Sequence, residues 1–411
     1  MSEPVINSID NRGVAPYRLL DAWRGIAALW VVMLHCCIAA VADGWPHLAS
    51  EPFYAFCLRG QLGVYMFFII SGYCITAAAV SALKKPQSVW YFLRARVRRI
   101  YPPYIASSVV AVCFYLLCSF LAAHHLMPKV NHPLPFRGEH FLFYFAALTM
   151  TQVPLHTKMI LVVYWTLCYE VTFYAIVAVC LATLGRKSKT VLFSGLNVLT
   201  VASLIWLVVS PSTCPFPLNL WYQFGLGALV FMLINHSQER SVKFYFGAAV
   251  VLICLFAYFH QGPHFMGHPS TRIQAMFGVG FALGLLGLYR FDAVLSRIRG
   301  IQMVQWIGAI SYSLYLSHFF IIPIPQQAAK RLGFVDGTYW VSVLAQIAVA
   351  IAGAFIFHIL FERPFLSPQA RGREEKILSD RTSGYESGLE ERTAPSVPVA
   401  EPHQSPPATT I

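Results

Sequence analysis

Three polar residues in the first apolar stretch of the chain have types and spacings that could carry chemistry within a membrane. Asp21, Arg24 and His35 lie in the segment LLDAWRGIAALWVVMLH, and on an α-helix they share a stripe about 60° wide. An imidazole can take a proton from a hydroxyl at neutral pH. Charged groups in a membrane helix are costly and usually functional. We therefore favour a functional stripe over a capping ion pair beside a structural histidine.

A second cluster is the basic run RARVRRIYPPY at residues 94–104. Guanidinium groups bind phosphate through paired hydrogen bonds, so the run indicates a phosphorylated ligand at the cytoplasmic face. Membrane topology and lipid phosphates explain about half of these arginines equally well. Pro102 and Pro103 predict a rigid break after the run. The four candidate residues are Arg94, Arg96, Arg98 and Arg99.

A third cluster, WTLCYEVTFY at residues 165–174, places a carboxylate inside an apolar span. We expect Glu170 near the outer end of this span, where it needs a base, a histidine or a hydroxyl-rich ligand. Trp165 and Tyr169 are either interface aromatics or a surface on which a sugar stacks. His318, which ends the segment GAISYSLYLSH, is a weaker candidate than His35.

The composition excludes several classes of protein. Charged residues make up 12% and apolar residues 57% of the 411 residues, unlike an ordinary soluble enzyme or a disordered chain. The net charge of +12 comes from short basic clusters between apolar runs, which is typical of membrane loops, so nucleic-acid binding is excluded. Ten scattered cysteines without a CxxC pattern predict neither a disulfide framework nor a metal site.

We therefore predict an all-α polytopic membrane protein with ten transmembrane helices and both termini in the cytoplasm. Each span has about 20 mostly apolar residues. The apolar piece 141–153 is shorter and is predicted to be half-inserted, because its crossing would move later basic clusters to the outer side. The ten predicted spans are 22–41, 61–83, 104–123, 163–184, 190–210, 217–234, 244–260, 271–289, 303–324 and 338–361.

Three regions follow from this pattern. Residues 1–16 form a short cytoplasmic N-terminal segment without the apolar core of a signal peptide. Residues 17–365 form the transmembrane domain. Residues 366–411 are rich in Glu, Ser, Pro and Thr, which predicts a disordered cytoplasmic tail.

Taken in order, these segments resemble the acyltransferase 3 family of integral membrane acyltransferases. The resemblance covers residues 17–365, although Tyr65 stands where many members carry a small polar or acidic residue. The segments that carry it are LLDAWRGIAALWVVMLH, LGVYMFFIISGYCIT, RVRRIYPPY, WTLCYEVTFY, ISYSLYLSH and FERPF.

The resemblance implies that Arg24, His35, Arg98, Arg99 and Glu170 are functional, and the chemistry of the other candidate side chains suggests their roles. His35 is the expected catalytic histidine, and Glu170 is a second catalytic candidate. An acyl-CoA, most often acetyl-CoA, is the donor substrate, and no permanently bound cofactor or metal is expected. The residues expected to bind the donor are Asp21, Arg24, Arg94, Arg96, Arg98 and Arg99. Those expected to bind the acceptor, a carbohydrate, are Ser71, Trp165 and Tyr169.

The expected function is that of an O-acyltransferase in a lipid bilayer, with the bacterial inner (plasma) membrane favoured. It would move an acyl group from cytoplasmic acyl-CoA to a hydroxyl of a cell-surface or lipid-linked carbohydrate. His35 would accept either the hydroxyl proton or the acyl group itself. The alternative is a transporter or flippase of lipid-linked sugar or acylated metabolite, because charges within the membrane also mark transport paths.

Overall fold

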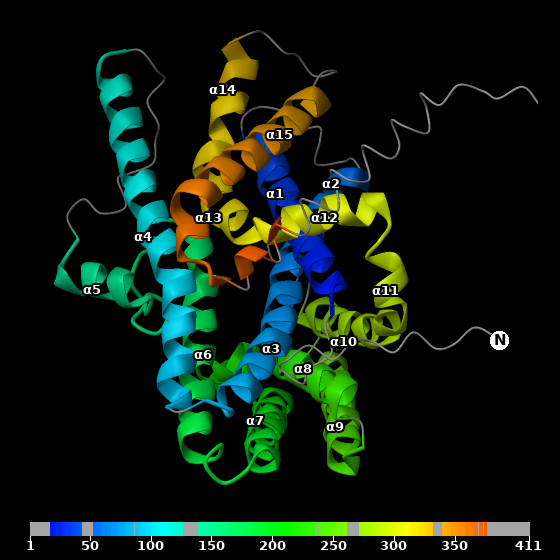
Figure 1. The fold of residues 1–411 in the computed structure, drawn as a ribbon. Coiled ribbons are helices and arrows are strands. Elements are labelled where there is room, and N and C mark those ends of the chain that lie inside the picture. Colours follow the sequence, from blue (N-terminus) through cyan, green and yellow to red (C-terminus); the bar gives the residue numbers. More distant parts are fainter. Residues whose placement is uncertain are drawn as a thin grey trace, which may run out of the picture.

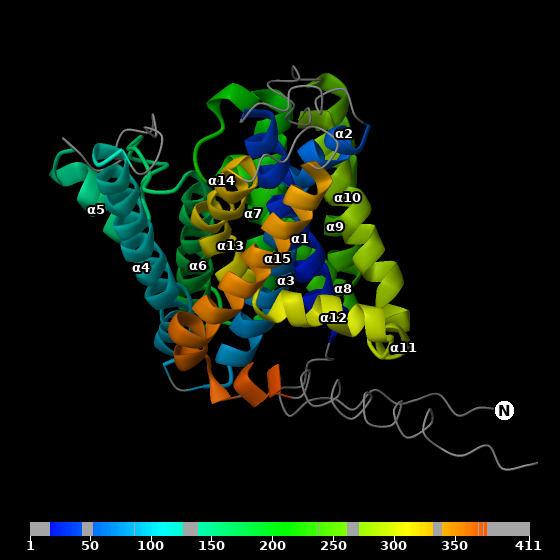
Figure 2. The same cartoon turned by 90° about the horizontal axis from the view of Figure 1, so that it is seen from above.

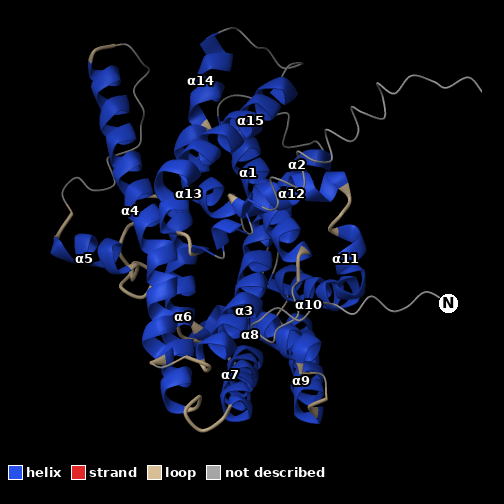
Figure 3. Ribbon diagram, viewed as in Figure 1, coloured by secondary structure: helices blue, strands red, loops and turns tan. Residues whose placement is uncertain are grey.

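The computed structural model describes most of the chain, and the described part consists of helices joined by loops and turns, with no strand in it (Figure 3). This confirms the all-α prediction for those residues. The predicted segment 1–16 and the tail beyond residue 375 lie outside them. The described residues are 17–42, 52–85, 87–125, 139–236, 238–260, 271–331, 339–368, 370–372 and 374–375.

Nine helical stretches of the described residues are long and apolar enough to cross a membrane, and one bent pair would make ten. They stand side by side as a bundle (Figures 1 and 2). The chain is therefore a multi-pass membrane protein, while the total of ten and the cytoplasmic termini stay predictions. The main helices of the nine are α1 (Leu19–Ala42), α3 (Leu62–Ala82), α4 (Ser88–Ala123), α6 (Trp165–Thr183), α7 (Lys189–Val209), α8 (Leu218–Asn235), α9 (Arg240–Phe259), α10 (Thr271–Leu288) and α15 (Tyr339–Phe357).

The predicted span 303–324 is not one straight helix. Helix α12 (Arg299–Ala309) meets α13 (Ser311–Ile321) at an angle of 71°, and α14 (Pro323–Arg331) follows. Figure 2 shows α12 lying across the end of α1 while α13 rises into the bundle. The count of apolar residues could not reveal this bend, because both halves are apolar.

The rigid break predicted at Pro102 and Pro103 is also absent, since α4 continues through both prolines. Each proline removes one helical hydrogen bond, but neighbouring helices hold this part of α4 in place. Tyr312 Oη donates a hydrogen bond to the carbonyl of Ile100 at 2.9 Å, and Ser107 Oγ lies 2.8 Å from Tyr164 Oη. Prolines within membrane helices are tolerated when neighbours supply such contacts.

Close backbone contact fixes α3 within the bundle. A Cβ atom on Gly227 of α8 would lie 1.8 Å from the carbonyl oxygen of Ile69 on α3. Glycine at such a position lets membrane helices approach at backbone distance. The contact holds α3 and therefore Ser71, which α3 carries.

The beginning of α1 is held by a residue distant in sequence. The buried carboxylate of Asp292, in the short helix α11 (Asp292–Leu295), accepts hydrogen bonds from the backbone N–H groups of Arg18 at 3.1 Å and Leu19 at 2.8 Å. A carboxylate at a helix N-terminus satisfies free N–H groups and complements the helix dipole. The contact fixes the end of α1 that carries Asp21 and Arg24.

The remaining short elements connect the bundle. Helix α5 (Phe141–Thr149) has nine residues and lies beside α4, and Tyr104 Oη donates to the carbonyl of Ala147 at 2.6 Å. Helix α15 continues into a π-helical turn at His358–Glu362. The others are α2 (Pro52–Leu58), Arg59–Gln61, Val162–Tyr164, Pro211–Thr213, Tyr289–Phe291 and Arg363–Phe365.

Candidate functional site

A pocket of about 110 Å³ lies among α1, α3, α4, α6 and α13. It brings together residues from five of the segments that the sequence analysis singled out. Its floor and walls also include apolar side chains such as Phe68 and Ile75. The polar and charged residues that line it are Arg24, Ser71, Arg96, Arg99, Thr166, Glu170, Tyr174, Ser311, Tyr312 and Tyr315.

The helix divides the arginine run into two faces. Arg96 and Arg99, three residues apart, line the pocket, whereas Arg94 and Arg98 are exposed and lie outside its lining. This division follows from the uninterrupted helix, in which residues three apart share a face. With Arg24 from α1, three guanidinium groups line a single pocket.

Arg96 has a free donor in this pocket. Its guanidinium carbon lies 5.7 Å from the ring centroids of both Phe92 and Tyr174. Its Nε atom is buried and has no hydrogen-bond partner among the described residues, and the same holds for Ser311 Oγ. Buried donors without partners are costly and uncommon in proteins. Together with three positive charges, they suit an anionic group such as a phosphate.

Glu170 lies in the same pocket as the arginines. Its Oε1 accepts hydrogen bonds from Ser71 Oγ and from Tyr174 Oη, the latter at 2.6 Å. Glu170 is the sixth residue of α6, a few residues into the span as predicted, and hydroxyl groups surround its carboxylate. Its position near the outer side of the membrane stays a prediction.

Trp165, Tyr169 and Asp21 lie outside the lining of the pocket. The rings of Trp165 and Tyr169 pack against Phe68, with centroids 6.2 Å and 6.0 Å away, and Asn219 Nδ2 donates to Tyr169 Oη at 3.0 Å. The two aromatics therefore meet the pocket only through Phe68, which lines it. Their role in acceptor binding stays a prediction, as does the role of Asp21 in donor binding.

His35 lies beyond the pocket, beside a second histidine. It is half-buried on α1, and its ring centroid lies 5.0 Å from that of His318 on α13. Tyr315, one helical turn before His318, lines the pocket. The sequence ranked His318 low because nothing in the sequence showed that it faces His35.

Comparison with known proteins agrees with this arrangement. Residues 17–359 match the profile of a family described as an acyltransferase domain, acyltransferase 3. The chain belongs to the acyltransferase 3 family. The exopolysaccharide production protein ExoZ of Rhizobium meliloti (strain 1021) is 26% identical over 337 residues, which cover 81% of this chain and 96% of ExoZ. No solved structure matches the chain.

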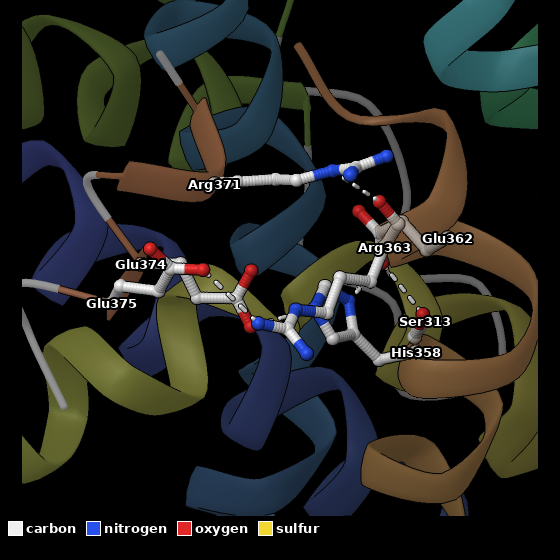
Figure 4. A network of polar contacts seen from close by, with 7 residues as sticks. All are labelled: Ser313, His358, Glu362, Arg363, Arg371, Glu374 and Glu375. Atoms are coloured by element: carbon white, nitrogen blue, oxygen red, sulfur yellow. Dashed lines mark hydrogen bonds and ion pairs between the residues drawn. The ribbon is translucent and has the colours of Figure 1, made fainter. Parts of the chain in front are cut away.

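At the end of the region that matches the acyltransferase 3 family, a buried network joins the end of α15 to the segment that follows it (Figure 4). Glu362 Oε2 accepts hydrogen bonds from Ser313 Oγ at 2.6 Å and from His358 Nδ1 at 2.9 Å. The other ring nitrogen of His358 lies 3.0 Å from Glu374 Oε1. Glu362 also interacts electrostatically with Arg99, so the network adjoins the pocket.

The sequence analysis assigned no role to this network. A buried glutamate four residues after a histidine in the last span was the available signal. Glu374 belongs to the segment predicted to be a disordered tail, yet it is 8% exposed and residues 370–372 are helical. In this acyltransferase 3 family member, the described part of that segment contacts the membrane domain.

Proposed function

We propose that the protein is a membrane O-acyltransferase that moves an acyl group, acetyl in the first place, from cytoplasmic acyl-CoA to a hydroxyl of a cell-surface or lipid-linked carbohydrate. One observation carries the proposal: Arg24, Arg96 and Arg99 line one pocket, and the helix that supplies Arg24 also carries His35. Membership of the acyltransferase 3 family supports the reaction class. The name of the ExoZ relative supports a polysaccharide acceptor.

The three arginines would hold the phosphates of the donor. Guanidinium groups form paired, charge-assisted hydrogen bonds with phosphate. The unpartnered Nε of Arg96 is a donor that such a group would satisfy. The acyl-bearing arm of the donor would then run along the bundle toward His35.

His35 has the hydrogen position that a general base needs. Its Nδ1 lies 2.8 Å from the carbonyl oxygen of Val31, and a carbonyl can only accept, so the neutral ring carries its hydrogen on Nδ1 and its lone pair on Nε2. Nε2 would take the acceptor hydroxyl proton as that oxygen attacks the thioester carbonyl. The carbon–sulfur bond then breaks and the thiolate receives the proton, which yields the ester and free CoA. Transfer through an acyl-histidine is the alternative route.

The test compares the O-acetyl content of surface glycans, measured by proton NMR, in four strains. These are the parent, the deletion strain, and deletion strains that carry wild type or His35→Ala at equal membrane abundance. We expect the acetyl signal to disappear on deletion, to return with wild type and to stay absent with His35→Ala.

An acetyl pattern that is the same in all strains would contradict glycan acetylation as the function. In that case, release of free thiol from acyl-CoA by the purified protein separates an acyltransferase with another acceptor from a transporter. A transporter would leave the thioester intact.

A further inference from the structure

The two histidines beyond the pocket present their basic nitrogens in the same way. Nδ1 of His318 lies 3.0 Å from the carbonyl oxygen of Leu314, as Nδ1 of His35 lies 2.8 Å from that of Val31. Because a carbonyl oxygen only accepts, each neutral ring carries its hydrogen on Nδ1. Each ring therefore holds its lone pair on Nε2, the atom that points away from the helix's own carbonyl.

A purely structural role for His318 accounts for the contact of its Nδ1 atom but not for its buried Nε2 atom. The side chain is 0% exposed, and its Nε2 has no hydrogen-bond partner among the described residues. Buried polar atoms are nearly always paired, so an orphan acceptor at this depth calls for a donor. The contact with Leu314 satisfies Nδ1 but does nothing for Nε2.

The neighbours of His318 identify the source of that donor. His35 is the described titratable group that acts on it electrostatically. The hydroxyl of Tyr315, whose ring is 5.9 Å away, is already bonded to Thr166 Oγ1 and to the carbonyl of Val163. Phe319, 5.7 Å from His35, adds an apolar wall. With ring centroids 5.0 Å apart, the two imidazoles are direct neighbours, close enough for one to donate a hydrogen bond to the other.

We propose that His318 is a positioning residue for the acyl transfer, acting through His35. When Nε2 of His35 takes the proton of the acceptor hydroxyl, Nε2 of His318 accepts a hydrogen bond from the new N–H and shares the proton. The proton then passes from His35 to the departing thiolate, and both rings return to the neutral form. The pair binds one proton at a time, because two adjacent positive rings repel each other. This inference rests on the function proposed for His35.

Two amide variants separate the two nitrogens of His318. His318→Asn can keep the donor to Leu314 but lacks an acceptor at the position of Nε2. His318→Gln places an amide oxygen or nitrogen near Nε2 and so can restore the acceptor. We expect His318→Asn to lower kcat by about 100-fold or more, the usual size of a proton-transfer effect. We expect His318→Gln to stay within about tenfold of wild type, with KM for acetyl-CoA changed less than twofold in both.

The pH profile is the readout that a structural role would not move. An imidazolium that shares its proton is more stable than one that does not. In His318→Asn the acidic limb of kcat/KM should therefore move to lower pH, and in His318→Gln it should move less. The assay measures thiol release from acetyl-CoA by purified protein in detergent, with glycan from the deletion strain as acceptor. Equal losses in both variants with an unmoved acidic limb would overturn the proposal.

A measurement without turnover keeps this inference separate from the proposed function. In protein labelled with ¹⁵N-histidine, Nε2 of His35 should titrate at lower pH in His318→Asn than in wild type. An unchanged titration would overturn the pair even in an active acyltransferase. A shifted titration in a protein that releases no thiol from acyl-CoA would uphold the pair and overturn the proposed function.

Discussion

Glu139 and Lys158, which flank α5 in the chain, form an ion pair with Lys158 Nζ 2.8 Å from Glu139 Oε1. The chain segments before and after α5 therefore lie on the same side of the helix bundle. Helix α5 is also only nine residues long, about half of what a crossing requires. Both observations agree with the prediction that the apolar piece 141–153 does not cross the membrane.

The same ion pair predicts the result of a labelling experiment. In a background without reactive native cysteines, Glu139→Cys and Lys158→Cys should be labelled by an impermeant maleimide from the same face of the membrane. Arg186→Cys should be labelled from the opposite face, because α6 lies between. Loss of an exposed ion pair costs little, so the variants should fold. Labelling of positions 139 and 158 from opposite faces would show that α5 crosses.

The crossing of α12 over α1 predicts a strong effect of one methyl group. A Cβ on Gly308 would lie 1.7 Å from the carbonyl oxygen of Asp21, and this backbone atom cannot move aside alone. Gly308→Ala should therefore lower the melting temperature in detergent clearly, by overpacking that typically costs about 1–3 kcal/mol. Gly300→Ala in the same helix is the control, since nothing lies within 4 Å of its Cβ position. Equal stability of the two variants would refute this packing.

The two faces of the arginine run predict unequal effects on donor binding. Arg96→Gln or Arg99→Gln should raise KM for acyl-CoA by about tenfold or more, which is the loss expected for a charge-assisted hydrogen bond. Arg94→Gln, on the exposed face, should stay within about twofold. Stabilisation by added CoA in thermal unfolding should follow the same order. An effect of Arg94→Gln equal to that of Arg96→Gln would indicate a general charge effect instead of a pocket.

The buried network predicts that two neighbouring glutamates contribute very differently to stability. His358 lies between the carboxylates of Glu362 and Glu374, so both ring nitrogens donate and the ring is positively charged. Glu374→Gln removes one charge from a buried group, which typically costs about 3–5 kcal/mol. Glu375→Gln, whose side chain is 61% exposed and pairs with Arg363, should cost less than about 1 kcal/mol. Unfolding in detergent measures both, and similar losses would contradict the network.

The local sequence pattern predicted which residue types form the site better than it predicted which residues contact one another. Helical spacing placed Arg24 and His35 on one stripe, and the structure places Arg24 in the pocket and His35 beyond it. Helical spacing also puts Arg94 and Arg96 on different faces of α4, as the structure has them, although the sequence analysis treated the four arginines as one group. In α4, contacts from other helices outweigh the local effect of the prolines.

Contacts between segments that are far apart in the chain could not be predicted from the sequence. His318 faces a residue almost 300 positions earlier, and Ser313 bonds Glu362 across two helices. Glu170 was expected to need a base, a histidine or a hydroxyl-rich ligand, and its carboxylate accepts hydrogen bonds from the hydroxyls of Ser71 and Tyr174. No local pattern encodes the contact with Ser71, because that residue belongs to another helix, α3.

The single helix α1 carries both Arg24 and His35, eleven residues apart, and so fixes the distance between these two residues. At about 1.5 Å per residue, their backbone positions are about 16 Å apart along the axis. A donor whose phosphates bind at Arg24 must have an arm long enough to bring its thioester to His35. Short thioesters that lack the phosphates would not be held at the distance that places the thioester beside His35. The enzyme would therefore select its donor by the length of this arm, before the acyl group is recognised. Any insertion in α1 between Arg24 and His35 would change the donor length that fits.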